Sequence, residues 1–466
     1  MATSPSTAAA QEAVGLDVLM ATLRSVHADG RTRSLEWRKR QLDGIARLVE
    51  ERETEIAEAL AMDLGRAAAE SWLGDITSTR GEALYARRHL RSWMKRKRQR
   101  MPLSQQPASG WVQYEPLGVV LVIGPWNYPV YLSLGPLVAA VAAGNCAVLK
   151  PSELAPATSA LLARLVPQYL DPEAVKVVEG DAVVTQDLLA LGFDHVLFTG
   201  GTEIGKKIMA GAAPTLTPVT LELGGKSPAI VLADADLDVA ARRIAWVKLM
   251  NSGQTCIAPD YVLVERSVRE ALVDKIIASM KAFRADQDGG MRIVNERQFD
   301  RIAGYLDATE GSVVAGGGTD RAALTVEPTV VVDPAPDEPL MTDEIFGPVL
   351  PVLTVDSADE AIRFVTRRPK PLALYVFTRG RAARTRLVDE IPAGGAVVNH
   401  AAMHCLVPSL PFGGVGASGI GAYHGEWGFQ RLSHRKAVLA KTFRPDLSVM
   451  YPPYTEKALN MMRRIL

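Results

Sequence analysis

The chain has 466 residues, 48% of them hydrophobic, so it is long enough to form two or more domains with large buried cores. Its 52 basic and 52 acidic residues cancel, which argues against a nucleic-acid partner because such a partner usually requires a net basic surface. Three cysteines in so long a chain exclude a disulfide framework and favour a reducing compartment.

No targeting signal or membrane span is evident. Residues 1–15 lack the basic start and the apolar block of a secretory signal. The most apolar stretch, residues 118–149, is interrupted by prolines and glycines, which is typical of a strand, a turn and a helix inside a core. We therefore expect a cytoplasmic protein without a membrane anchor.

The N-terminal part is predicted to be helical over residues 34–64, where apolar side chains recur at helical spacing among Arg, Lys and Glu. The basic run at residues 95–100 is interpreted as the solvated end of a helix, with a binding patch as the alternative. Residues 101–110 are expected to form a loop, and residues 111–116 a short exposed strand.

From residue 118 onward, short apolar segments alternate with helix-length stretches. Strands that are apolar throughout and separated by helices indicate parallel sheets covered on both faces. We therefore predict an α/β fold with two doubly wound parallel-sheet domains and a cofactor and substrate that meet in the crevice between them. The predicted strands are 118–124, 145–150, 174–180, 194–200, 228–234, 261–265, 348–355, 372–377 and 395–400.

Two glycine-rich segments are candidates for binding the phosphates of a dinucleotide. Residues 414–419 match GxGxxG, but they follow no predicted strand and precede no βαβ unit, so we interpret them as a turn. The better candidate is at Gly200 and Gly201, where a strand ends and a helix is expected to begin at about Thr202. An ordinary glycine-rich loop is the alternative for this second segment.

Lys150 and Glu153 lie where another strand ends and a helix with Pro151 in its first turn is expected to begin. A donor ammonium and an acceptor carboxylate at the C-terminal end of a strand suit the paired hydroxyls of a ribose. A capped helix start with a surface ion pair accounts for the same residues equally well.

Cys256 lies in a turn of small and polar residues directly after an apolar helix predicted at residues 237–250. A structural cysteine usually lies in an apolar run, as Cys146 does, so the surroundings of Cys256 favour an accessible thiol. A nucleophilic thiol also needs a base, and without one a lone cysteine is more often not catalytic.

Glu222 is the candidate base because it interrupts an otherwise apolar strand. Burial of an unpaired carboxylate raises its pKa toward the range that a general base near neutral pH requires. Gly224 and Gly225 follow it and allow another group to approach closely. Asn127 lies at the mouth of the first apolar strand, where its amide could point at a developing oxyanion; a turn residue bonded to its own backbone is the alternative.

Seven segments together resemble the aldehyde dehydrogenase superfamily over nearly the whole chain. They are GPWNYP, KPSE, FTGGTEIG, LELGGKSP, NSGQTCIAP, EIFGPVLP and PFGGVGASGIG, in the order and spacing of that family. The tyrosine in GPWNYP, the segment NSGQTCIAPDY and the modest length are most similar to class 3, a dimeric branch that takes medium-chain and aromatic aldehydes. The membrane helix that ends some members of that branch is not expected here.

The resemblance implies that Cys256 attacks the aldehyde carbon, that Asn127 and the Cys256 backbone N–H hold the oxyanion, and that Glu222 activates the water that hydrolyses the thioester. It implies NAD as the favoured cofactor, with NADP left open, and no metal. Lys150 and Glu153 would contact the adenosine ribose, residues 200–205 the pyrophosphate, and Glu344 and Phe346 the nicotinamide ribose and ring. The residues implied to bind the cofactor are Trp126, Lys150, Glu153, Gly200, Gly201, Thr202, Gly205, Leu223, Glu344 and Phe346.

The resemblance also implies three domains, a homodimer and a small-molecule aldehyde as the substrate. Residues 1–100 and 118–222 would form the NAD(P)-binding domain, and residues 223–421 the catalytic domain. Residues 101–117 and 422–466 would form an oligomerisation arm and a C-terminal tail.

Two residues depart from the family pattern. Gly201 stands where many members have a serine, so only the backbone is left to contact a phosphate. Cys405 lies where the family's substrate tunnel is lined, and it is interpreted as a spectator thiol.

Three other functions stay open. A coenzyme A-acylating dehydrogenase usually lacks a glutamate at the Glu222 position. A catalytically silent family member with a binding role is disfavoured by the intact Cys256, Glu222 and Asn127. A thiol hydrolase would need a histidine near the cysteine.

Overall fold

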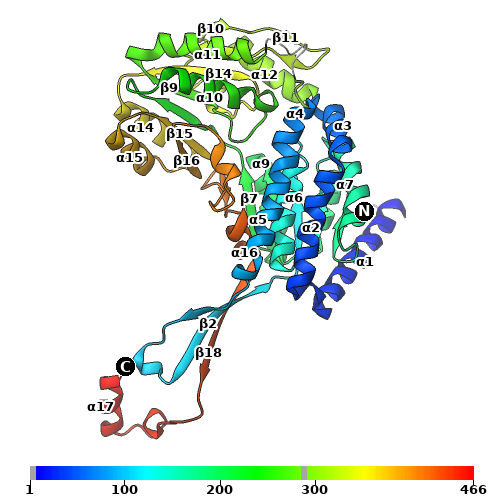
Figure 1. The fold of residues 1–466 in the computed structure, drawn as a ribbon, viewed down its shortest axis with the longest axis vertical. Helices are drawn as coiled ribbons and strands as arrows, with labels where there is room; N and C mark the ends of the chain where they lie inside the picture. Colours follow the sequence, from blue (N-terminus) through cyan, green and yellow to red (C-terminus); the bar gives the residue numbers. More distant parts are fainter. Residues whose placement is uncertain (1–6, 285–290, 466) are drawn as a thin grey trace, which may run out of the picture.

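The computed structural model describes residues 7–284 and 291–465. Two largely parallel sheets, each flanked by helices, lie one above the other, and a long antiparallel arm projects from the lower one (Figure 1). The predicted α/β class with two doubly wound sheets is therefore confirmed. None of the helices in the described ranges combines the length and the apolar character that crossing a membrane would require.

The first sheet has the strand order β17-β7-β6-β3-β4-β5, and only β17 runs antiparallel to its neighbour. The chain begins this sheet at β3 and winds outward to both sides, so the boundary between β3 and β6 is a topological switch point. The loops after these two strands lie at the carboxyl edge of the sheet, where open α/β sheets bind their ligands. The strands are β3 (Val119–Ile123), β4 (Cys146–Lys150), β5 (Val175–Val177), β6 (His195–Gly200), β7 (Val219–Leu223) and β17 (Gly419–Ile420).

The second sheet has the order β10-β13-β14-β9-β8-β15-β16, with only β10 antiparallel to its neighbour. Its strands are β8 (Pro228–Val231), β9 (Tyr261–Glu265), β10 (Ser312–Ala315), β13 (Thr329–Val332), β14 (Val349–Val355), β15 (Ala373–Phe377) and β16 (Gly395–Val398). Between β10 and β13 the chain forms a small hairpin of β11 (Thr319–Asp320) and β12 (Thr325–Val326).

The helix predicted at residues 34–64 is two helices, α2 (Leu35–Glu51) and α3 (Glu53–Leu64), that meet at Arg52. The apolar positions that predicted it, Leu42, Ile45, Val49, Ile56 and Leu60, are all fully buried. The remaining larger helices are α1 (Thr7–Asp29), α5 (Thr77–Trp93), α6 (Tyr131–Ala143), α7 (Pro156–Tyr169), α8 (Ala182–Ala190), α9 (Thr202–Ala212), α10 (Leu237–Leu249), α11 (Arg269–Phe283), α12 (Glu296–Ala308), α14 (Ala358–Thr366), α15 (Arg381–Glu390), α16 (Gly425–Arg431) and α17 (Glu456–Ile465).

The arm is a three-stranded antiparallel sheet in which β2 (Ala108–Pro116) pairs with β1 (Lys97–Gln99) on one side and β18 (Ser433–Lys441) on the other. The predicted strand at residues 111–116 is confirmed, but it begins earlier, because pairing with β18 continues to Ala108. The loop prediction is therefore wrong for residues 108–110.

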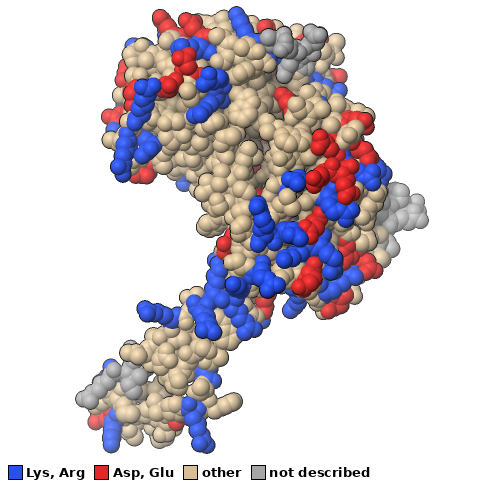
Figure 2. All heavy atoms as spheres, viewed as in Figure 1, with Lys and Arg blue, Asp and Glu red and all other residues tan. Residues whose placement is uncertain are grey.

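The basic run at residues 95–100 is exposed, as expected, but its interpretation as a helix end is wrong, because α5 ends at Trp93 and β1 lies within the run. Lys97 of this run pairs with Glu426 of α16, and Figure 2 shows a basic surface where the arm leaves the body of the molecule. In this segment, residues 97–99 form backbone hydrogen bonds with β2 and not helical hydrogen bonds.

The proposed domain boundaries stay a prediction, and the described contacts refine one of them. Residues 425–431, assigned to the tail, form α16, which packs against α5 and α6 beside the first sheet. β17, assigned to the catalytic domain, pairs with β7 of the first sheet. The chain thus returns to the first sheet before it enters the arm.

Candidate active site

Cys256 follows α10 and a tight turn at Met250–Gly253 (η5), in which Asn251 and Ser252 have left-handed φ angles of 52° and 54°. These angles are unfavourable for side chains other than glycine, and such strain is typical of functional loops. Cys256 is partly exposed as a residue, in agreement with the predicted accessibility. Burial of its surroundings raises its pKa, so a base has to accept the proton before the sulfur can attack.

Glu222 lies in β7 with 3% of its surface exposed. Neither carboxylate oxygen has a hydrogen-bond partner among the described residues. Burial therefore raises the pKa of Glu222 well above its ordinary value, as the sequence predicts for a base. Its charge lies close enough to Cys256 to contribute to the raised pKa of that thiol.

Asn127 lies in the loop after β3, and its amide Nδ2 donates to the backbone oxygen of Gln254 at 3.1 Å. The backbone oxygen of Asn127 accepts a hydrogen bond from Asn251 Nδ2 at 2.9 Å. The alternative interpretation, a turn residue bonded to its own backbone, is therefore wrong. One amide hydrogen of Asn127 is left beside the turn that carries Cys256.

The segment after β6 has the geometry that a pyrophosphate requires. Helix α9 begins at Thr202, where the sequence predicts it, and no described side chain caps its N-terminus at Gly201. A Cβ atom at Gly201 would meet open space, whereas at Gly205 it would come within 2.7 Å of Leu223. Gly205 therefore allows close packing of helix on strand, and the open side at Gly201 leaves backbone N–H groups for an anion.

Lys150 ends β4, with its side chain 3% exposed, and its Nζ donates to Glu153 Oε2 at 2.8 Å. The predicted pairing of an ammonium with a carboxylate at this strand end is therefore present. The predicted helix start is wrong, because α7 begins at Pro156 and residues 151–155 form a turn. Pro156, whose fixed φ suits the first helical turn, marks the start instead of Pro151.

Glu344 and Phe346 lie in the loop before β14. Burial raises the pKa of Glu344 to about 8, and the neighbouring Asp260 contributes in the same direction. A Cβ atom at Gly224 would collide with the Glu344 carboxylate, so Gly224 allows the close approach that the sequence predicts. Phe346 has a left-handed φ of 49°, and its ring meets Trp126 edge to face with centroids 5.3 Å apart.

The groups that hold this loop were not predicted. Arg301 donates to the backbone oxygens of Glu344 and Ile345 at 2.9 and 2.8 Å. Asp260 accepts from the Ile345 N–H at 3.1 Å and pairs with Lys226 at 2.6 Å. Lys226 is the lysine of the GGK segment and Asp260 directly follows CIAP, which was a usable signal, whereas Arg301 lies in α12 with no motif around it.

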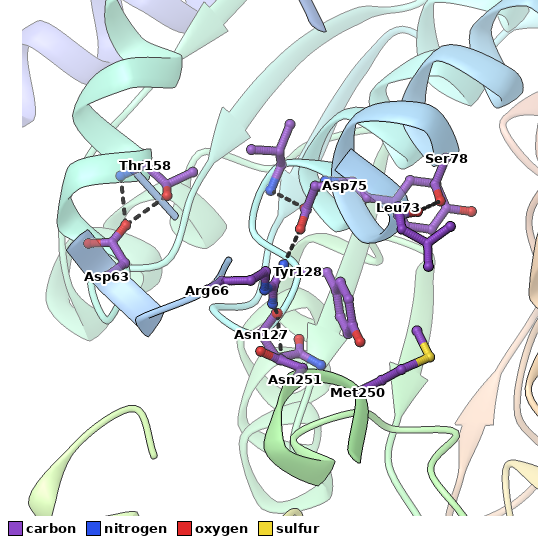
Figure 3. A network of polar contacts seen from close by, with 12 residues as sticks. Asp63, Arg66, Leu73, Asp75, Ser78, Asn127, Tyr128, Thr158, Met250 and Asn251 are labelled. Atoms are coloured by element: carbon purple, nitrogen blue, oxygen red, sulfur yellow. Dashed lines mark hydrogen bonds and ion pairs between the residues drawn. The ribbon is translucent and has the colours of Figure 1, made fainter. Parts of the chain in front are cut away.

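A second unpredicted set, Arg66 and Asp75, forms a buried ion pair under the Asn127 loop (Figure 3). The phenol of Tyr423 is also buried, and its oxygen has no hydrogen-bond partner in the described parts of the chain. Burial raises the pKa of Tyr423, with a contribution from the charge of Glu222.

Cys405 is partly exposed, and burial of its surroundings raises its thiol pKa to about 12.

The GxGxxG segment at residues 414–419 is a turn that ends in β17, as predicted, and it does not open a helix. Gly419 is paired with Glu222 across β17 and β7, and a Cβ atom at Gly419 would collide with the backbone oxygen of Leu221. These glycines therefore allow the chain to close the sheet edge beside the strand that carries Glu222.

These residues fit a dinucleotide by their own chemistry. The uncapped N-terminus of α9 suits a pyrophosphate, and the Lys150–Glu153 pair offers a donor and an acceptor to a ribose. Phe346 contacts Trp126, and the loop that carries Glu344 and Phe346 packs closely on the thiol turn. A Cβ atom at Gly253 in that turn would collide with the backbone oxygen of Gly347.

Comparison with known proteins places these observations in a family. A sequence model described as the aldehyde dehydrogenase family matches residues 6–438. The dimeric NADP-preferring aldehyde dehydrogenase of Rattus norvegicus is 45% identical over 442 residues, which cover 93% of this chain and 97% of the relative. The substrate-bound AldH of Staphylococcus aureus superposes with a TM-score of 0.93 at 38% identity, covering 97% of this chain and 99% of the other. The indole-3-acetaldehyde dehydrogenase of P. syringae in complex with NAD+ has a TM-score of 0.85 at 29% identity, covering 92% and 89%.

Proposed function

The chain belongs to the aldehyde dehydrogenase family, and we propose that it oxidises an aldehyde to a carboxylic acid with NAD(P)+ through a thioester on Cys256. The observation that carries this mechanism is the set of groups around the thiol. A partly exposed cysteine follows a turn that is hydrogen-bonded to the Asn127 amide, and an unpaired buried carboxylate, Glu222, acts on the thiol's pKa.

In the first step, the Cys256 sulfur forms a bond to the aldehyde carbon, and the carbonyl electron pair moves onto the oxygen. Because burial raises the pKa of this thiol, its proton has to pass to solvent water as the sulfur attacks. The oxyanion accepts hydrogen bonds from the free Asn127 amide hydrogen and the Cys256 backbone N–H. A donor in such a place contributes about a hundred- to a thousandfold in rate.

NAD(P)+, when bound, would supply the hydride acceptor through which the substrate carbon on Cys256 becomes a thioester. The residues that would hold the cofactor are Trp126, Lys150, Glu153, Gly200, Gly201, Thr202, Gly205, Leu223, Glu344 and Phe346. NAD is favoured because the Glu153 carboxylate would repel a 2′-phosphate, and NADP stays open because a 45% identical relative is named NADP-preferring.

In the last step, Glu222 removes a proton from a water molecule that attacks the thioester carbon. The tetrahedral oxyanion uses the same two donors, and its collapse expels the Cys256 sulfur and releases the acid. Glu222 has no neutralising partner among the described residues, so its carboxylate is left for this proton transfer. Its presence favours water over coenzyme A as the acyl acceptor.

Two variants test the mechanism. Cys256→Ala should abolish NADH formation while NAD+ binding, followed by fluorescence quenching, stays within about twofold of wild type. Glu222→Gln should give a stoichiometric NADH burst followed by slow turnover, because thioester formation outruns its hydrolysis. Residual steady-state turnover in Cys256→Ala would exclude the covalent route, and a full steady-state rate in Glu222→Gln would exclude Glu222 as the base for hydrolysis.

We also propose that the protein is a homodimer joined through its arm. The support is the projecting three-stranded sheet, whose β18 carries exposed apolar side chains such as Leu439, and the named dimeric state of the rat relative. A cytoplasmic location stays a prediction.

A further inference from the structure

We propose that Arg66 and Asp75 are positioning residues that fix the direction of the Asn127 amide toward the thiol turn. Neither residue touches the reacting groups, and both lie on the N-terminal helical segment, far from Asn127 in the sequence (Figure 3). The proposal rests on the oxyanion role of Asn127 proposed above.

Arg66 joins two parts of the site through one guanidinium group. Its side chain is 1% exposed, its Nη1 donates to Asp75 Oδ2, and its Nη2 donates to the backbone oxygen of Asn127. The guanidinium carbon also lies 4.6 Å from the centroid of the Tyr128 ring. A planar fork can make these two hydrogen bonds at once, whereas a lysine ammonium has one donor centre.

Asp75 holds the far end of the same loop. Its Oδ1 accepts from the backbone N–H groups of Val130 and Tyr131 at 3.0 and 2.8 Å, where α6 begins. Its side chain has no exposed surface. The ion pair therefore clamps the loop on both sides of Tyr128, from Asn127 to Tyr131.

The opposite side of Asn127 is fixed by the thiol turn. Asn251 Nδ2 donates at 2.9 Å to both the Asn127 and the Gln254 backbone oxygens. The Tyr128 hydroxyl lies 2.9 Å from Thr255 Oγ1, directly before Cys256. Loss of the Arg66 contact would leave the Asn127 carbonyl held from the thiol side alone, so its amide could turn away from the oxyanion.

A buried ion pair is poor at adding stability, because the desolvation of two charges offsets most of their attraction. Directional hydrogen bonds to a loop are what such a pair supplies well. The turn that carries Asp75, η2 (Trp72–Ile76), has the wider winding of a π-helix, which in other proteins marks functional sites. These features support a role in positioning.

The test uses conservative variants of the full enzyme and a single-turnover measurement of NADH formation. Arg66→Lys keeps the charge beside Asp75 but cannot span to Asn127, and Asp75→Asn keeps the shape but removes the ion pair. Each should lower the single-turnover rate about tenfold or more, as expected for a displaced catalytic contact, with NAD+ affinity unchanged within about twofold. Arg38→Lys is the matched control, because Arg38 is equally buried and donates to the Thr32 and Ala142 backbone oxygens, away from the thiol.

Combination with Asn127→Ala decides whether the pair acts through Asn127. Asn127→Ala alone should lower the rate about a hundred- to a thousandfold, and adding Arg66→Lys should lower it no further. Multiplicative effects, or a wild-type rate in both conservative variants, would overturn the proposal. The proposal would also be overturned if Arg66→Lys and Asp75→Asn both failed to fold while Arg38→Lys folded. A wild-type rate in Asn127→Ala would instead overturn the oxyanion role, and with it the premise, independently of the Arg66 result.

Discussion

At the scale of single residues, burial of the acids Glu222 and Glu344 lowers the stability of the folded state. Burial raises the pKa of Glu222 well above its ordinary value and that of Glu344 to about 8. For Glu222, no hydrogen bond from a described residue compensates the loss of water. A charged group in such a place destabilises the folded state, so its retention points to chemistry and not to stability.

Glu82 allows the same physics to be tested away from the thiol. Burial raises its pKa from 4.5 to about 7, and its Oε1 accepts from the Gly425 N–H at 2.6 Å. The folded state therefore keeps this proton over a pH interval in which the unfolded chain has released it. The wild type should lose stability as the pH rises through this interval.

Glu82→Gln keeps the acceptor and cannot ionise. Its advantage in unfolding free energy over wild type should grow from about pH 5 to pH 8 and level off near 3 kcal/mol, about 1.4 kcal/mol for each pKa unit. Thermal or urea unfolding of both proteins across this range measures it. A difference that does not vary with pH would show that Glu82 is not protonated in the folded state near neutrality.

At the scale of elements, the thiol turn and η2 are local structures whose shapes are set by what packs against them. Gly74 in η2 lies against the Tyr128 ring, and an added Cβ atom would come within 2.8 Å of it. Tyr128 follows Asn127 directly, so a displaced ring would also move the amide. The glycine is therefore needed for close approach, and its φ angle plays no part.

Gly74→Ala should lower kcat while leaving NAD+ affinity unchanged, and it should destabilise the fold by about 1–3 kcal/mol through overpacking. Gly81→Ala in the neighbouring helix α5 is the matched control, because nothing lies within 4 Å of its added Cβ atom. That substitution should stabilise the protein by about 1 kcal/mol through helix propensity. Steady-state kinetics and thermal unfolding compare the two, and equal effects would contradict the packing argument.

At the scale of the whole molecule, the arm projects away from both parallel sheets (Figure 1). Its outer strand β18 pairs with β2 over residues 433–441, and Leu439 there is 53% exposed. An exposed leucine on a strand that projects into solvent is unfavourable in a monomer and suits burial between two copies.

Leu439→Asp should therefore shift the protein from dimer to monomer at micromolar concentration, measured by sedimentation velocity. Val314→Asp is the control, because Val314 is a similarly exposed apolar residue, at 46%, on the far sheet. A dimer that withstands Leu439→Asp as well as it withstands Val314→Asp would place the interface elsewhere.

The sequence by itself determined the fold class and most strands of the two parallel sheets. Apolar runs bounded by glycines predicted β3, β4 and β6, because a strand buried on both faces must be apolar throughout. A glutamate inside the apolar strand β7 predicted a carboxylate with a raised pKa, and burial produces that shift. These properties depend on near neighbours in the chain, and local patterns report them.

Only the tertiary structure decided what depends on partners distant in the sequence. β1 and the first residues of β2 are strands because they pair within the arm, and nothing in their own composition indicates it. The Arg66–Asp75 pair lies under Asn127, and Gly224 faces Glu344, through contacts that span many residues of chain. A hydrogen bond or a close approach requires two groups to lie close together in space, and a local sequence pattern contains only one of the two.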